Sequence, residues 1–278
     1  MDKISLKIKM LYNEMGKAEK HIADWIFENP GKIISLSIVE LAELCKCSEA
    51  TIVRFSKRLG LSGYQELKIS LAAESGSSAI SSSITAEDSP FTMYEKICND
   101  IYLSFEKTKK SLKAESLELA CKKISEANKI VIFGLGNSAS IATDASHKFL
   151  RAGLNSVAYS DNHMQVIAAS HLTEKDVAIG ISHSGSSKDI VDALKISKEH
   201  GATTVSLTKA GKSSLLKYTD IPLFTSAAET EYSILALNSR IVQLAIIDSI
   251  YNYVVLNHSQ KALESIKDTE HSLLAKKY

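Results

Sequence analysis

The first quarter of the chain carries the periodicity of amphipathic helices. Apolar residues recur at helical spacing over residues 18–26, and the pattern stops at Asn29-Pro30 because proline disfavours helix in the residue before it. A second helix is predicted to begin after Ser37, where Glu40 completes a capping box three residues further on. The first part of the chain is therefore predicted to be all-helical.

A third helix is predicted over residues 48–59, with Ser48 as its N-cap and Gly60 as a left-handed C-cap. Its apolar residues fall on one face, and the other face is polar and positively charged. This helix follows the second one after the short link Cys45-Lys46-Cys47, so the pair forms a candidate helix-turn-helix.

The second part of the chain alternates short apolar runs with helical segments. Helical periodicity covers residues 91–127 and returns in a long segment over residues 234–250. The alternation predicts an α/β fold, with a right-handed parallel sheet and helices on both of its faces. The apolar runs, typical of strands buried on both sides, are residues 130–133, 157–161, 176–182, 203–208 and 221–224.

A serine-rich stretch separates the two parts. It has seven serines between Ser75 and Ser89, no aromatic residue and no periodic apolar face, so it cannot offset its own ordering entropy. We predict a helix-turn-helix domain over residues 1–74, a linker over 75–90 and a ligand-binding domain over 91–278.

Composition narrows the class of protein. The chain is 45% hydrophobic and 23% charged, which excludes collagen-like, mucin-like and wholly disordered chains. No apolar run approaches about 18 residues, so no membrane partner is expected, and lysines near the start argue against a secretory signal. The four cysteines lack zinc spacing, so we expect no metal and reduced thiols in a cytoplasmic protein.

Positive charge is concentrated at the candidate helix-turn-helix, although the net charge of the chain is only +1. Residues 46–68 hold five cations and two anions, whereas the rest of residues 1–74 holds six cations and eight anions. In this motif the start of the second helix meets base edges, and cations further along meet phosphates. The alternative is a helical bundle with solvated charges that binds no DNA. The residues predicted to contact double-stranded DNA are Ser48, Glu49, Ala50, Thr51, Arg54, Lys57 and Arg58.

Two loops in the second part have the residues that a phosphate needs. The first follows residues 130–133 as Gly-Leu-Gly-Asn-Ser and opens a helix, whose N-terminus attracts an anion. The second follows residues 176–181 as Ser-His-Ser-Gly-Ser-Ser, and helix capping would explain one of its serines but not four. In an open parallel sheet both loops lie at the carboxyl ends of the strands. The predicted ligand-binding residues are Gly136, Asn137, Ser138, Ser182, Ser184 and Ser187.

The first loop also admits a dinucleotide site. Its pattern is GxGxS, because Ala139 stands where the third glycine of the dinucleotide motif would be. Asp161, at the end of the second predicted strand, is the acidic residue that such a site would use.

Together these motifs resemble a known family. GLGNS and SHSGSSKD on alternating strands and helices resemble the sugar isomerase (SIS) domain. EKHIADWIFENP and LSIVELAELCKCSEATIVRFSKRLGLSGYQELK resemble the N-terminal helix-turn-helix domain of RpiR/MurR-type transcriptional regulators. The resemblance covers both predicted domains.

The resemblance implies a bacterial regulator of carbohydrate metabolism that binds a double-stranded operator as a homodimer or tetramer. Its effector would be a phosphorylated sugar in the SIS domain, with no cofactor and no catalytic residue. Asn137 and Ser138 match the family's first phosphate loop, and the serines at 182, 184 and 187 match the hydroxyls of SxSGxT. SIS isomerases use a glutamate base, and Glu231 is included among the ligand-binding candidates because it lies in that region, as does Glu229.

Two other functions stay open at this point. An aldose–ketose phosphate isomerase with an appended helical domain would need a base within reach of the sugar's C1 and C2. A helical scaffold that binds a protein instead of DNA is the other alternative.

Overall fold

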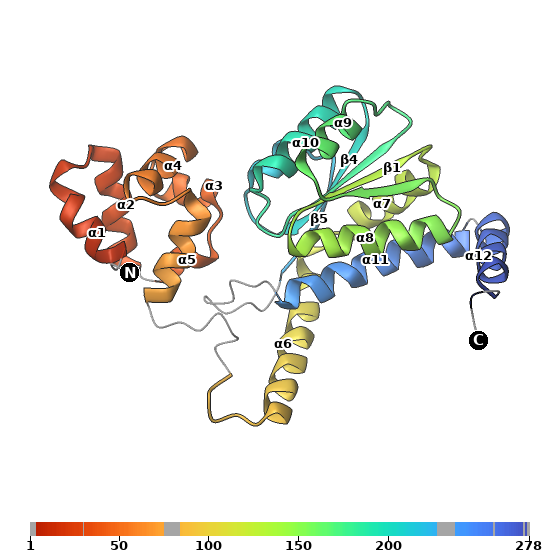
Figure 1. The fold of residues 1–278 in the computed structure, drawn as a ribbon, viewed down its shortest axis with the longest axis horizontal. Helices are drawn as coiled ribbons and strands as arrows, with labels where there is room; N and C mark the ends of the chain where they lie inside the picture. Colours follow the sequence, from red (N-terminus) through yellow and green to blue (C-terminus); the bar gives the residue numbers. More distant parts are fainter. Residues whose placement is uncertain are drawn as a thin grey trace. The chain divides into compact units, whose positions relative to one another are not determined.

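The structure is a computed structural model that describes residues 4–29, 31–74, 84–226, 237–257, 259–274 and 276. The chain divides into two compact units, one helical and one built on a β-sheet (Figure 1), and the division falls within helix α6 (Pro90–Ser111), after Tyr102. Residues 75–83 of the predicted linker lie outside the described residues, and residues 84–89 lead into α6.

Five helices surround the core of the first unit. Ile8, Ile22, Leu41, Ile52 and Phe55 are completely buried in it, so each of α1 to α4 contributes to one core. The helices are α1 (Ile4–Leu11), α2 (Lys17–Glu28), α3 (Ile38–Leu44), α4 (Glu49–Arg58) and α5 (Tyr64–Glu74), with short 3-10 turns at Tyr12–Glu14 and Lys32–Ser35.

The helix ends follow the chemistry that the sequence predicts. The backbone N–H of Glu40 donates to Ser37 Oγ at 3.2 Å, and the N–H of Ser37 donates to the Glu40 carboxylate at 2.7 Å, which completes the capping box of α3. Ser48 Oγ accepts from the N–H of Thr51 at 3.2 Å at the start of α4. Gly60 ends α4 with a φ of +84°, as expected for a left-handed C-cap.

The second unit is a parallel five-stranded sheet in the order β2-β1-β3-β4-β5. The five predicted strands are present, which confirms the α/β fold. The strands are β1 (Ile130–Gly134), β2 (Ser156–Tyr159), β3 (Val177–Ile181), β4 (Thr203–Lys209) and β5 (Ile221–Thr225). Its helices are the second part of α6, from Leu103 on, and six helices that follow it in the described residues. These six are α7 (Ala114–Glu126), α8 (Asn137–Arg151), α9 (Asn162–Ala169), α10 (Lys188–Glu199), α11 (Leu237–Asn257) and α12 (Ser259–Leu274), with a 3-10 turn at Ser214–Tyr218.

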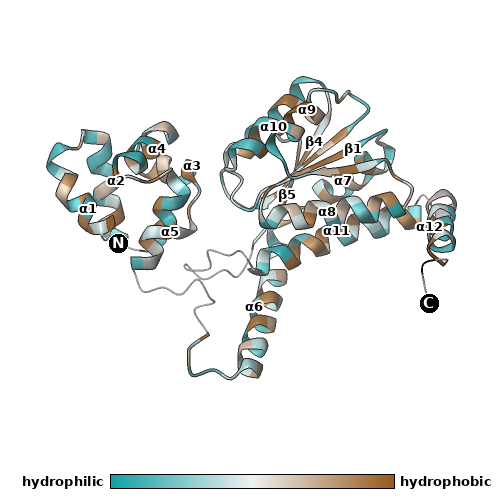
Figure 2. Cartoon of the chain, viewed as in Figure 1, coloured by the Kyte–Doolittle hydropathy of each residue, from teal (hydrophilic) through white to brown (hydrophobic). Residues whose placement is uncertain are grey.

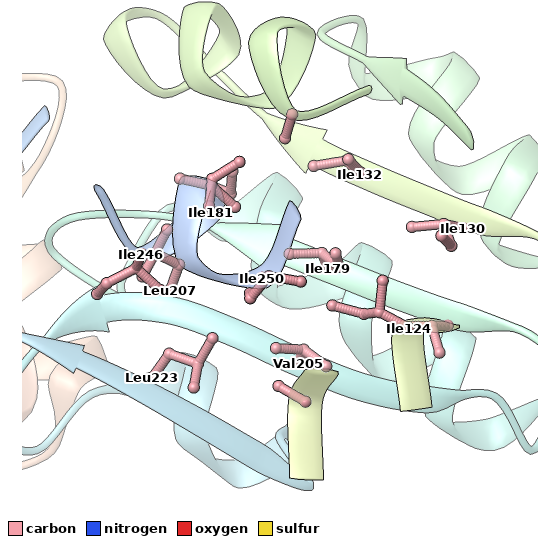
Figure 3. Packing of buried hydrophobic residues seen from close by; sticks show 14 of the residues in the cluster. Ile124, Ile130, Ile132, Ile179, Ile181, Val205, Leu207, Leu223, Ile246 and Ile250 are labelled. Atoms are coloured by element: carbon pink, nitrogen blue, oxygen red, sulfur yellow. The ribbon is translucent and has the colours of Figure 1, made fainter. Parts of the chain in front are cut away.

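Helices cover both faces of this sheet. On one face, α7, α8 and α11 bury a cluster that includes Ile132, Ile179 and Ile250 (Figure 3). On the other face, α9 and α10 pack against Val131 and Phe133. Successive residues of β1 therefore serve opposite cores, which explains why the strand is apolar throughout.

The C-terminal helix α12 packs against the end of α8. An added Cβ on Gly153, which follows α8, would lie 2.3 Å from Ser265 Oγ of α12, so this approach requires glycine. Arg151 of α8 forms an ion pair with Glu270 of α12. These contacts hold α12 against the end of α8.

No helix in the described part of the chain is both long enough and apolar enough to span a membrane.

Candidate functional site

The first predicted ligand loop lies between β1 and α8. Gly134 ends β1, and an added Cβ there would lie 2.6 Å from the backbone oxygen of Ser138, so only glycine permits this close approach. Gly136 is the N-cap of α8 with a φ of +53°, and it has no side chain to cap the helix. Asn137 is exposed and Ser138 is half-buried in the first turn, so the positive end of the helix dipole is presented beside two polar side chains.

The second predicted ligand loop lies between β3 and α10. Ser182 is buried and donates a hydrogen bond from Oγ to Ser187 Oγ at 3.1 Å, which leaves the Ser187 hydroxyl proton to donate elsewhere. Ser187 is the N-cap residue of α10, yet its side chain makes no capping hydrogen bond. Ser184 is exposed, and its Oγ accepts from the N–H of Ser186 at 3.3 Å. The loop therefore presents hydroxyl donors at a second helix N-terminus.

The two loops follow neighbouring strands. Gly134 at the end of β1 is paired with Ile181 at the end of β3, so Gly136, Asn137 and Ser138 leave the sheet beside Ser182. The strand order reverses between β1 and β3, because β2 lies on one side of this pair and β4 and β5 on the other. Such a switch point is where open α/β sheets bind ligands. The structure brings the two predicted loops to the same edge.

Backbone hydrogen bonds from later elements hold the serine loop in place. The N–H of Lys209, at the end of β4, donates to the His183 oxygen at 3.1 Å. The N–H of Leu215 donates to the Gly185 oxygen at 2.9 Å, and Gly185 has a φ of +62°. These bonds fix the loop through its backbone, which lowers the cost of ordering it for a ligand.

Gln165 of α9 is a positioning residue that is not among the predicted site residues. Its side chain is completely buried, and its Nε2 donates to the Tyr159 oxygen at 2.9 Å and to the Gly134 oxygen at 3.5 Å. It therefore connects the carboxyl ends of β1 and β2 beside the first ligand loop. The only available signal was one polar residue among the apolar residues of Met164–Ala169 in this helix.

Two further sequence predictions concern this region: the acidic residue of a dinucleotide site and a glutamate in the ligand site. Asp161 lies beyond β2 and accepts from the N–H of Met164 at 2.9 Å as the N-cap of α9, so a capping role explains it without a dinucleotide. Glu231 and Glu229 lie outside the described residues. Among the residues that are described, no group of three His, Cys, Asp or Glu side chains is arranged to hold a metal ion.

The predicted DNA-binding residues lie on and beside α4. Its buried face carries Ile52 and Phe55, while Ala50, Arg54 and Lys57 are exposed on the other side. The side chains near its N-terminus are mutually oriented: Ser48 Oγ lies 2.9 Å from Thr51 Oγ1, and Arg54 Nη2 donates to Thr51 Oγ1 at 3.3 Å. Glu49 is half-buried in the first turn. This arrangement suits a recognition helix whose first turn approaches base edges.

Arg58 is placed differently from Arg54 and Lys57. Its guanidinium pairs with Glu19 of α2 at 3.0 Å and donates to the backbone oxygen of Glu14 at 2.9 Å. The side chain thus connects the end of α4 to the segment that begins α2. A phosphate contact by Arg58 stays a prediction, and it would have to share the guanidinium with these acceptors.

The two cysteines of the helix-turn-helix link have raised pKa values. Burial, together with the neighbouring Cys47, raises the pKa of Cys45 to about 11, and burial also raises the pKa of Cys47. Both thiols therefore stay protonated near neutral pH and are poor nucleophiles.

Comparisons with known proteins match both units. Residues 3–78 match the helix-turn-helix domain of the rpiR family, and residues 123–253 match the SIS domain. An uncharacterised HTH-type transcriptional regulator of Caldanaerobacter subterraneus is 39% identical over 97% of this chain and 96% of its own length. The HTH-type transcriptional regulator HexR of Pseudomonas aeruginosa is 32% identical over 98% of this chain and 96% of its own length.

A solved structure has the same overall fold. The NanR protein of Vibrio vulnificus, in complex with ManNAc-6P, aligns with a TM-score of 0.82 over 99% of this chain and 100% of that chain. Its sequence is 21% identical, so the likeness concerns the fold.

Proposed function

Because the chain belongs to the rpiR family of helix-turn-helix transcriptional regulators, we propose that a phosphorylated sugar controls its affinity for operator DNA. The sugar phosphate binds at the two loops that follow β1 and β3, and α4 binds DNA. The proposed divisions are a DNA-binding domain over residues 1–74, a linker over 75–90 and a SIS domain over 91–278. The protein acts in the cytoplasm, where its DNA is.

The observation that carries this proposal is the pairing of Gly134 with Ile181. It places two helix N-termini and the hydroxyls of Ser138, Ser182, Ser184 and Ser187 at one edge of the sheet. A phosphate monoester carries nearly two negative charges at neutral pH. Hydroxyl donors and helix dipoles stabilise such an anion without a fixed cation, so it can be released again.

On the DNA side, α4 enters the major groove of a two-fold operator, one half-site for each copy of the chain. Glu49, Ala50 and Thr51 meet base edges, and Arg54 meets a base or a phosphate. Lys57 binds the phosphate backbone. Control by the sugar requires that the ligand bind the DNA-competent arrangement and the other arrangement with different affinities.

The alternative function, an aldose–ketose phosphate isomerase, has less support. Relatives that match nearly the whole chain are named transcriptional regulators, and the helix-turn-helix match is to a regulator family. The ligand site is therefore proposed as a sensor.

A thermal-shift screen of phosphorylated sugars tests the ligand site. A sugar phosphate at 100 times its dissociation constant is expected to stabilise the folded chain by about 2.7 kcal/mol, and the same sugar without phosphate is expected to have no effect. Ser184→Ala should abolish the shift. Ser186→Ala is the matched control, because it removes a neighbouring hydroxyl that is outside the proposed ligand set. Failure of every phosphorylated sugar, or wild-type binding by Ser184→Ala, contradicts the proposal.

A further inference from the structure

Arg240, near the start of α11, is a partly buried cation without a partner among the described residues. Its side chain is half-buried, and its Nε atom is shielded from solvent and makes no hydrogen bond. No carboxylate in the part of the chain that the structure describes forms an ion pair with it. A charge that is removed from water without a partner lowers stability, so such a group calls for a functional explanation.

A second donor without an acceptor lies one turn further along α11. Gln243 is 1% exposed, and its Nε2 atom has no hydrogen-bond partner. Residues three apart on a helix are neighbours on its surface, so the side chains of Arg240 and Gln243 occupy adjacent positions. Polar residues occur among the apolar ones along α11 (Figure 2). At these two positions the polar groups are donors that the described chain does not satisfy.

Helix α11 brings Arg240 to the edge of the sheet where the ligand loops lie. Ile250 lies beside Ile179 in the middle of β3, and Ile246 lies beside Ile181 at its carboxyl end (Figure 3). Arg240 comes six residues, or about 9 Å, further toward the N-terminus of α11. It therefore lies beyond the ends of the strands. Side chains of a helix also lean toward its N-terminus, which directs the guanidinium further in the same direction.

An ion pair between α8 and α11 shows how these two helices are aligned. Lys148 of α8 contacts Asp248 of α11, and both helices run away from the ligand edge (Figure 1). Eight residues earlier in each helix, Arg240 is at the level of Ser140, in the first turns of α8. Asp144, one turn before Lys148, already pairs with Lys148 at 3.0 Å. Arg240 is thus placed beside the start of α8, which the first ligand loop opens.

Arg240 approaches this edge from one side of the proposed phosphate position. Helices α8 and α11 cover one face of the sheet, and α10, which follows the serine loop, covers the other. A phosphate that accepts from the N-termini of both α8 and α10 lies between the two faces. The guanidinium, on the α11 side of α8, therefore reaches a different part of the same ligand. The group that matches a guanidinium best is a planar carboxylate, which accepts two parallel hydrogen bonds from it.

We propose that Arg240 binds a carboxylate of the effector, so that the effector is a phosphorylated sugar acid. This inference rests on the proposed function, because it takes the phosphate to be held by the loops that follow β1 and β3. Phosphate and carboxylate are then bound at two separate positions, which fixes the orientation of the sugar between them. Arg240 determines specificity, because a neutral sugar leaves its charge without a partner.

Two pairs of ligands, each differing in one group, test this specificity. 6-Phosphogluconate and glucitol 6-phosphate are open-chain molecules that differ only at C1, where the first has a carboxylate and the second a hydroxymethyl group. Glucuronic acid 1-phosphate and glucose 1-phosphate are the corresponding pair with a closed ring. In isothermal titration calorimetry of the full-length chain, the acid of at least one pair is expected to bind at least about tenfold more tightly than its neutral counterpart. Equal binding, or tighter binding of the neutral sugars, overturns the inference.

Arg240→Gln separates a contact with the carboxylate from a general role in the ligand site. It is expected to weaken binding of the acid about tenfold or more, and to leave binding of the neutral counterpart unchanged. Ser184→Ala should instead weaken both, because both carry the phosphate. Arg151→Gln is the matched control, since Arg151 lies at the far end of α8 and pairs with Glu270. Equal weakening of acid and neutral sugar by Arg240→Gln would assign the guanidinium to the phosphate and overturn the inference.

Urea denaturation of the unliganded chain tests the same residue without a ligand. Because Arg240 has no partner in the described chain, Arg240→Gln is expected to leave the denaturation midpoint unchanged or to raise it. A lower midpoint would show that the guanidinium stabilises the fold, and it would overturn the assignment of Arg240 to the ligand.

The outcomes separate this inference from the proposed function. If only neutral phosphorylated sugars stabilise the chain and change its affinity for DNA, the carboxylate contact is overturned and the sugar-phosphate-controlled regulator stands. If no phosphorylated sugar stabilises the chain, whether acidic or neutral, both are overturned.

Discussion

Lys46 is the residue that turns the chain between α3 and α4. Its φ of +51° makes it the one non-glycine residue with a positive φ in the part of the chain that the structure describes. The N–H of Cys47 donates to the Ala42 oxygen at 2.9 Å, and the N–H of Lys46 donates to the Glu43 oxygen at 3.1 Å, which is the pattern of a Schellman motif. Gly60, Gly153 and Gly201 take the equivalent position after α4, α8 and α10.

Replacing Lys46 with glycine is therefore expected to stabilise the chain. A left-handed conformation costs an ordinary residue about 1–2 kcal/mol, and part of the gain is lost because glycine has more freedom when unfolded. The expected net increase in the free energy of unfolding is about 0.5–1 kcal/mol, measured by urea denaturation. Lys57→Gly, within α4, removes the same charge and should cost about 1 kcal/mol. A less stable Lys46→Gly chain would contradict this account of the turn.

Gly134 has the opposite character, because space and not backbone conformation requires it. An added methyl group would lie 2.6 Å and 2.9 Å from backbone atoms of Ser138, which cannot move without shifting the first turn of α8. Gly134→Ala is expected to destabilise the chain by about 1–3 kcal/mol and to weaken sugar-phosphate binding. Gly63→Ala is the control, because nothing lies within 4 Å of its added Cβ. Equal stability of the two variants would show that the loop tolerates displacement.

At the scale of elements, Asp220 connects α10, β4 and β5. Its carboxylate accepts from the N–H and the hydroxyl of Thr204 at 2.9 and 2.8 Å, and from Lys198 at 2.7 Å. Burial alone would raise the pKa of Asp220, but the hydrogen bonds from Lys198 and Thr204 outweigh it and lower the pKa below its ordinary value. The connection is therefore strongest when Asp220 is ionised.

Asp220→Asn is expected to reduce the free energy of unfolding at pH 7 by about 1 kcal/mol, because solvent screens this partly exposed carboxylate. A lowered pKa contributes stability above the unfolded value of about 4, and this contribution is lost as the pH falls through the folded pKa. Denaturation curves of the variant and the wild type should therefore converge below about pH 4. Asp192→Asn, in an exposed pair with Lys188, should change little at any pH. A difference that grows on acidification would contradict the assigned role.

A feature of a helix or strand can be predicted from sequence when the residues that form it lie close together along the chain. The caps at Ser37 and Ser48 and the stop at Gly60 depend on neighbours within a few residues, so the sequence predicts them. The pairing of Arg58 with Glu19 joins residues 39 positions apart in different helices, and no local pattern indicates it. The bridge from Gln165 to Gly134 likewise appears only after the strands are placed side by side.

At the scale of the whole molecule, the chain combines a helical unit and a sheet unit that each have their own core. The sequence predicts both units and the edge of the sheet where the ligand loops meet, because the loops that follow the strands of a parallel sheet all lie at its carboxyl edge. The strand order is known only from the structure. The exposed aromatic residues of α6 escaped prediction, since apolar residues at helical spacing in a sequence are normally assigned to the core. Only the exposure of Phe91, Tyr94 and Tyr102 shows otherwise.

The central claim is that sugar phosphate binding and DNA binding are linked in one chain. Fluorescence anisotropy measures this directly, with a labelled duplex selected from random DNA by the full-length protein and the sugar phosphate found by thermal shift. Saturating sugar phosphate is expected to change the affinity for DNA at least about fivefold, the lower end of ordinary allosteric coupling. Ser184→Ala should bind DNA but lose the response, and Arg54→Ala should lose DNA binding but still be stabilised by the sugar. A sugar phosphate that stabilises the wild-type chain yet leaves its affinity for the selected DNA unchanged would contradict the account.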